Sequence, residues 1–172
     1  MATTTPTVTI DRAWILEQFS KGVDSLDGMK TEAEARAQSP PDAELALLYS
    51  EIAKSVARHR EVVSTIAARY GDTPSRGAGG GIGEAIGRIK DKVGEMGASS
   101  LDLVGKDLGA KSNAIHWSRA WVEAFAAIGD TQSSEELATV LAEEETHRDA
   151  LQKVLATLVT RGARGELTAK KA

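Results

Sequence analysis

Three side chains that could bind a metal ion or move a proton lie on the apolar stripes of predicted helices. Glu144 and His147 are three residues apart, so a helix over residues 133–162 places both on one face. His59 lies on the apolar stripe of a second predicted helix, over residues 42–70. Burying a carboxylate or an imidazole is costly unless a partner compensates for the lost water. The pattern therefore predicts that these three residues converge at a buried polar site.

Two kinds of site fit these residues. His59, Glu144 and His147 match the two-histidine, one-carboxylate set that holds mononuclear iron, and zinc or manganese would also accept it. Alternatively, one of the histidines forms a hydrogen bond with Glu144 and no metal is bound. Lys111 lies near the inward face of its predicted helix and could neutralise Glu144 instead.

Other candidate residues are expected to face away from this site. His116 lies opposite the mean apolar direction of its helix, so we expect it to be exposed or at a subunit contact. Glu51 lies on the flank of its helix's apolar stripe and is expected to be solvated. The sequence contains neither Gly-x-Ser-x-Gly nor His-Glu-x-x-His, so no catalytic residue is assigned.

Four segments have apolar residues three and four positions apart, which is typical of amphipathic helices. They span residues 11–38, 42–70, 99–129 and 133–162. The first two are joined by a short connection, and so are the last two, which predicts two antiparallel hairpins. One long crossover would join the hairpins into an all-α four-helix bundle.

The predicted crossover, over residues 71–98, contains a glycine-rich run at 77–83 that lacks the Gly-Lys-Ser/Thr of a phosphate-binding loop. Isoleucines at helical spacing follow this run, which predicts a short amphipathic helix against the bundle. The expected domain covers residues 11–161. Flexible segments are expected at 1–10 and 162–172.

Composition excludes several classes of function. The 172 residues include no cysteine, so thiol chemistry and thiolate metal sites are excluded. The formal net charge of −4 gives no general attraction to nucleic acid or to anionic lipid. The longest apolar runs are far shorter than a membrane span, and the N-terminus does not resemble a signal peptide. A cytoplasmic protein is therefore expected.

The third predicted helix has two apolar faces. One of them carries Trp117, Trp121 and Phe125. If the other face packs in the bundle, this one needs cover, either from the crossover or from a second copy of the chain. A homodimer through this face is the partner that the sequence predicts.

Residues 11–161 resemble the ferritin-like superfamily, which includes ferritin, bacterioferritin and rubrerythrin. The resemblance is based on the wiring of the helices and on Glu144-Glu145-Thr146-His147, which is similar to the Glu-x-x-His of that family's last helix. In the family, this motif, a second Glu-x-x-His and two further glutamates hold two iron or manganese ions. The resemblance implies that Glu144, His147 and His59 are ligands.

The sequence departs from this pattern at the other ligand positions. Val56 stands three residues before His59, where the family has glutamate, and the matching levels of the first and third helices carry no inward acid. The resemblance therefore implies a reduced site, mononuclear or vestigial, and two functions stay open. One is a protein that binds a single iron, manganese or zinc ion, with a role in iron metabolism or the oxidative stress response. The other, which the missing acids favour, is a metal-free, dimeric structural or binding module.

Overall fold

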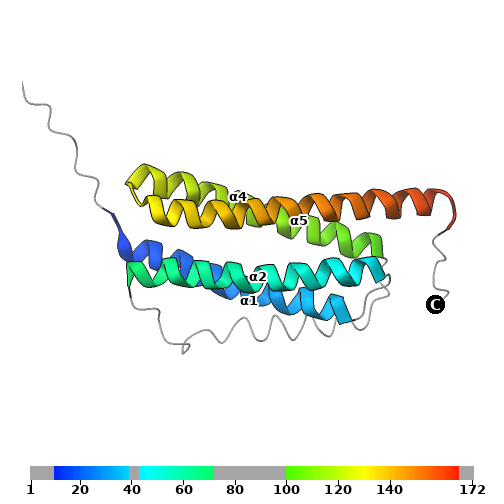
Figure 1. Cartoon of the computed structure of the whole chain (residues 1–172), viewed down its shortest axis with the longest axis horizontal. Helices are drawn as coiled ribbons and strands as arrows, with labels where there is room; N and C mark the ends of the chain where they lie inside the picture. The colour runs from blue at the N-terminus through cyan, green and yellow to red at the C-terminus, as the bar shows by residue number, and fades with distance from the viewer. Residues whose placement is uncertain (1–9, 39–42, 72–99, 167–172) are drawn as a thin grey trace, which may run out of the picture.

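Four long helices make up most of the described chain (Figure 1). In this computed structural model the described residues are 10–38, 43–71 and 100–166, and they contain no strand. The helices are α1 (Arg12–Gln38), α2 (Ala43–Tyr70), α4 (Ser100–Ile128) and α5 (Thr131–Ala163). The prediction of an all-α four-helix bundle is confirmed, and the predicted helix ranges agree closely with these bounds.

The helices form two hairpins that lie side by side (Figure 1). α1 packs mainly against α2, α4 packs mainly against α5, and α2 also contacts α5. Only Gly129 and Asp130 separate α4 from α5, so the chain must reverse there. Gly129 has a φ of 81°, a conformation that glycine adopts without the strain imposed by a side chain.

Some predicted segments lie outside the described residues. They are the amphipathic helix in the crossover and almost all of the rest of the crossover, together with most of the two flexible ends. These features stay predictions. The last helix continues to Ala163, which includes the first two residues of the predicted C-terminal tail.

The start of α5 differs from the one expected. The sequence predicted a start at Ser133, where Ser133 and Glu136 have the spacing of a capping box, but the helix begins at Thr131 and is capped by Asp130. The Asp130 carboxylate accepts a hydrogen bond from the backbone N–H of Ser133 at 3.1 Å. Glu136 instead pairs with Arg69 of α2 at 2.5 Å. Glu136, the residue that a capping box would need, therefore forms an ion pair with Arg69 of the facing helix instead.

An aromatic cluster fills one half of the core. Phe19 of α1 packs edge-on against Trp121 of α4, with ring centroids 4.9 Å apart, and lies 5.4 Å from Phe125. Trp117 lies 5.2 Å from Phe19 and is partly buried. The aromatic face of α4, for which the sequence offered the crossover or a second copy as cover, is therefore covered by α1. The homodimer itself stays a prediction.

An aliphatic cluster fills the other half of the core. It includes Val56 on α2, Val104 on α4 and Leu151 on α5. On the same three helices the aromatic cluster includes Val63, Trp121 and Leu137, which lie about two turns away on α2 and farther away on α4 and α5. The stretch between the two clusters carries the buried polar residues described below.

None of the described helices has an apolar stretch long enough to cross a membrane.

The aromatic cluster predicts a large effect for truncation of a central ring. Phe125 is fully buried, so we expect Phe125→Ala to reduce the free energy of unfolding by about 3–5 kcal/mol through lost burial and the resulting cavity. Urea denaturation followed by circular dichroism measures this loss. Leu47, which is 73% exposed, provides the control: Leu47→Ala should change stability by no more than about 0.5 kcal/mol. Equal losses in the two variants would contradict this core.

Candidate functional site

His59 of α2 and Glu144 of α5 meet between the two apolar clusters. The Nδ1 atom of His59 lies 2.9 Å from Oε1 of Glu144. The two residues are 2% and 1% exposed. Each residue lies on the apolar stripe of its own helix. The sequence predicted that both side chains point inward, and both lie in the core.

Lys111 of α4 is the third member of this site. Its Nζ atom lies 2.7 Å from Oε2 of Glu144, and the lysine side chain is 4% exposed. The contact is an ion pair without the angles of a well-aligned hydrogen bond. Burial raises the pKa of Glu144, but the hydrogen bond from His59 and the charge of Lys111 outweigh this effect, so the pKa lies below its ordinary value. Glu144 is therefore an ionised carboxylate in the core.

A second carboxylate, Glu143, approaches the same imidazole from its other side. The hydroxyl of Ser55 and the guanidinium of Arg58 donate to its Oε2 at 2.5 Å and 2.9 Å. The same oxygen lies 3.0 Å from Nε2 of His59. Partial burial raises the pKa of Glu143, but these bonds outweigh it and lower the pKa to about 2. His59 therefore bridges two ionised carboxylates.

Both ring nitrogens of His59 are engaged by this arrangement. A ring nitrogen can donate to a carboxylate only when it carries a hydrogen. The imidazolium form satisfies both contacts, whereas a neutral ring leaves one nitrogen lone pair facing a carboxylate oxygen. In the imidazolium form, neither nitrogen has a lone pair free for a metal ion.

His147 lies close to these charges but is not bonded to them. It is half-buried, and its buried Nδ1 atom has no hydrogen-bond partner among the described residues. Burial and the nearby charge of Lys111 lower the pKa of His147. The structure thus joins His59 to Glu144 and leaves the third predicted ligand separate.

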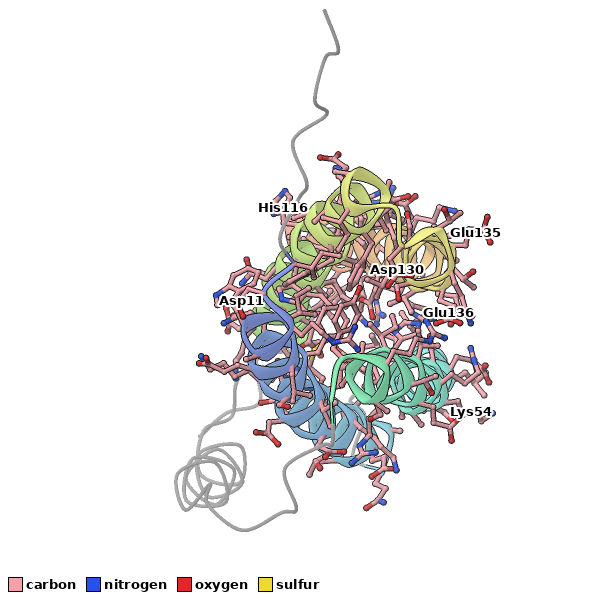
Figure 2. The ribbon with its side chains drawn as sticks, turned by 90° about the vertical axis from the view of Figure 1, so that its left-hand side faces the viewer. Asp11, Lys54, His116, Asp130, Glu135 and Glu136 are labelled. Atoms are coloured by element: carbon pink, nitrogen blue, oxygen red, sulfur yellow. The ribbon has the colours of Figure 1, made fainter. Side chains whose placement is uncertain are left out.

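The remaining candidates face solvent. His116 is exposed and extends from the outer side of α4 (Figure 2). Glu51 is also exposed and pairs with Lys54 at 2.8 Å. Both positions agree with the sequence-based expectation.

In the arrangement observed, protein groups already contact the donor atoms of His59 and Glu144. Among the residues that the structure describes, no three His, Asp or Glu side chains are grouped so that they could hold one. Lys111 supplies a positive charge at the carboxylate that would be the central ligand. Metal binding by His59, Glu144 and His147 stays an untested prediction.

Ser55, His59 and Glu144 are connected in the order of a nucleophile, a base and an acid. The Ser55 hydroxyl oxygen lies 3.0 Å from Nε2 of His59, and Nδ1 faces Glu144. Ser55, however, is fully buried, and its hydroxyl hydrogen is directed at Glu143. This serine cannot meet a substrate in the arrangement observed, so the geometry favours a structural network.

The sequence analysis missed Ser55 and Glu143. Ser55 lies one helical turn before His59, a spacing that brings the two side chains together on one face. Glu143 adjoins Glu144 in a run of three glutamates, and periodicity alone does not tell which of its neighbours turns toward the facing helix. The four-residue spacing between Ser55 and His59 could have identified Ser55 as part of the site.

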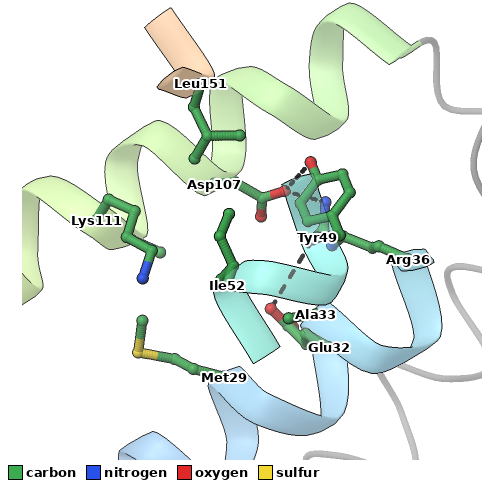
Figure 3. A pocket seen from close by; sticks show the side chains of 10 residues that line it. Met29, Glu32, Ala33, Arg36, Tyr49, Ile52, Asp107, Lys111 and Leu151 are labelled. Atoms are coloured by element: carbon green, nitrogen blue, oxygen red, sulfur yellow. Dashed lines mark hydrogen bonds and ion pairs between the residues drawn. The ribbon is translucent and has the colours of Figure 1, made fainter. Parts of the chain in front are cut away.

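A second polar cluster lies toward the C-terminal end of α1 (Figure 3). Arg36 and the hydroxyl of Tyr49 both donate to Oδ2 of Asp107, each at 2.5 Å. Burial raises the pKa of Asp107, and Arg36 and Tyr49 partly oppose this shift. Beside the cluster is a cavity of about 30 Å³, with Lys111 on its wall. That volume suits one or two water molecules and no larger ligand.

Acid should remove the contribution of Glu143. Its carboxyl titrates at about 2 instead of its ordinary 4.5, so it stabilises the folded chain above pH 4.5 and loses this contribution as the pH falls toward 2. We expect the difference in unfolding free energy between the wild type and Glu143→Gln to shrink across this window. Urea denaturation at a series of pH values measures it, with the exposed Glu135→Gln as the control for loss of one charge. A difference that stayed constant down to pH 2 would count against the network.

Removing Asp107 should be costly, because the hydroxyl of Tyr49 loses its acceptor and the buried guanidinium of Arg36 keeps only the longer contacts to Leu103 and Glu32. We expect Asp107→Ala to lower the free energy of unfolding by about 3–5 kcal/mol. Glu51→Ala breaks an exposed pair and should cost less than about 1 kcal/mol. Thermal and urea unfolding of the two variants provide the comparison, and a small loss in Asp107→Ala would refute the assigned role.

Comparison of the chain with known protein families, with curated proteins and with solved structures finds no match. No family is therefore assigned. The four-helix bundle is compatible with a ferritin-like fold, and membership of that superfamily stays a prediction.

Proposed function

We propose that this chain is a ferritin-like four-helix bundle that works without a metal centre, as a structural or binding module. The observation that carries the proposal is the charge balance at Glu144. Its two carboxylate oxygens face Lys111 and His59, so the protein itself supplies the positive partners. A buried carboxylate that is already paired does not need a metal ion for neutralisation.

The residues of α1 and α4 at the level of Glu144 support the same proposal. A two-metal centre needs bridging and terminal carboxylates from several helices. At the matching level, α1 has Phe19 and α4 has Ile115, both of which are buried apolar side chains. Two metals held in this bundle would lack the oxygen ligands that oxygen-activating centres use.

The alternative is a single metal ion held by His59, Glu144 and His147. It requires the imidazole of His59 to give up a carboxylate contact and requires Lys111 to leave Glu144. The two functions therefore differ in a measurable property, which is the metal content of the purified protein. Dimerisation is a separate prediction that either function allows.

Metal analysis tests the proposal directly. The protein is incubated anaerobically with excess Fe²⁺, Mn²⁺ or Zn²⁺, desalted, and analysed by inductively coupled plasma mass spectrometry. We expect far less than one metal ion per chain, and the same melting temperature with and without EDTA. His147→Ala and the exposed His116→Ala are the matched pair of variants. One ion per chain in the wild type and in His116→Ala, lost in His147→Ala, would reject the proposal and establish the alternative.

A further inference from the structure

We propose that the ammonium group of Lys111 takes the place of a metal ion beside Glu144, and that this tethered cation keeps divalent metals out of the bundle. The inference rests on the proposed metal-free function and names the residue that enforces it. Its support is the burial, distance and charge of the side chains around Glu144.

Glu144 needs a cation in the core, and the chain provides one that cannot diffuse away. Glu144 is 1% exposed, so water does not solvate its charge. Lys111 comes from the facing helix, is itself almost fully buried, and places Nζ 2.7 Å from the carboxylate. Because Lys111 is covalently attached, the neutralising charge is present at every metal concentration.

The same ammonium group opposes a second cation. A divalent ion bound to Glu144 would lie close to the charge of Lys111 in a region of low polarity, where like charges repel strongly. Lys111 would have to move away from Glu144, and Ile52 and Leu151 line the small adjoining cavity together with it. Metal entry therefore requires the buried ion pair to break.

Removing the ammonium group would reverse this preference. Glu144 would keep one partner, His59, and His147 would offer its unbonded Nδ1 atom one turn along α5. A metal ion would have to displace one ring proton of His59 and the carboxylate contact that this proton makes. Glu144 and the two imidazoles would then be ligands that Co²⁺ and Zn²⁺ accept. A metal ion would then be the available replacement for the lost charge.

The test uses Lys111→Met, which keeps a long side chain and removes the charge. Lys54→Met is the matched control, because Lys54 is exposed on the outer face of α2 (Figure 2). The double variant Lys111→Met/Glu144→Gln removes both charges of the pair. Equilibrium dialysis with Zn²⁺, visible absorption spectra with Co²⁺ and melting temperatures with and without Zn²⁺ are measured on all three variants and the wild type.

We expect Lys111→Met to be destabilised in EDTA, to bind about one metal ion per chain, and to melt at higher temperature with Zn²⁺. The wild type, Lys54→Met and the double variant should show none of these metal effects. A Lys111→Met protein that folds only with metal present also supports the inference. The double variant should fold without metal, because no unpaired carboxylate remains.

Four results would overturn the inference. If Lys111→Met folds but binds neither Zn²⁺ nor Co²⁺, Lys111 does not exclude these metals, and the proposed metal-free function is unaffected. Failure of Lys111→Met to fold even with metal, or failure of the double variant to fold, shows that Lys111 does more than neutralise Glu144. Stoichiometric metal in the wild type instead rejects the proposed function itself.

Discussion

An ionised carboxylate in the centre of a helical bundle is tolerated only where opposite charge and hydrogen bonds surround it. Glu144 sets this constraint, and three helices meet it: α2 brings His59, α4 brings Lys111, and α5 carries the glutamate. The apolar core divides into two clusters, one on each side of this charged layer. The position of Glu144 along α5 therefore determines where the polar layer lies in the whole bundle.

Two further polar clusters lie toward opposite ends of the bundle. At one end Tyr70 donates to Asp130 at 2.6 Å, and at the other Arg36 pairs with Asp107. Each cluster, like the Glu144 site, joins one hairpin to the other. Sliding the hairpins by one helical turn would leave buried donors and acceptors unpaired at three levels, each at the cost of lost hydrogen bonds. The polar layers thus favour one register, which apolar packing alone would specify less sharply.

Helical periodicity was enough to predict the four helices and the inward direction of His59 and Glu144, because those properties follow from 3.6 residues per turn. The short connections predicted the pairing of the helices into hairpins. Periodicity also indicated that Lys111 could neutralise Glu144. Periodicity did not predict the contact between Glu143 and His59, because two successive glutamates point to different sides of a helix and the position of α2 decides which side is polar. Periodicity also did not predict that α1 packs over Trp121, because the crossing geometry of α1 and α4 depends on side chains from both helices.

The Lys111–Glu144 pair has a consequence for the order of assembly. Both residues belong to the α4–α5 hairpin, whereas His59 arrives with the other hairpin. The carboxylate can therefore acquire its counter-charge within one hairpin, before the two halves dock. Docking then removes water from a pair that is already neutral overall, which costs less than stripping a lone anion. The polar centre thus does not hinder hairpin-by-hairpin folding.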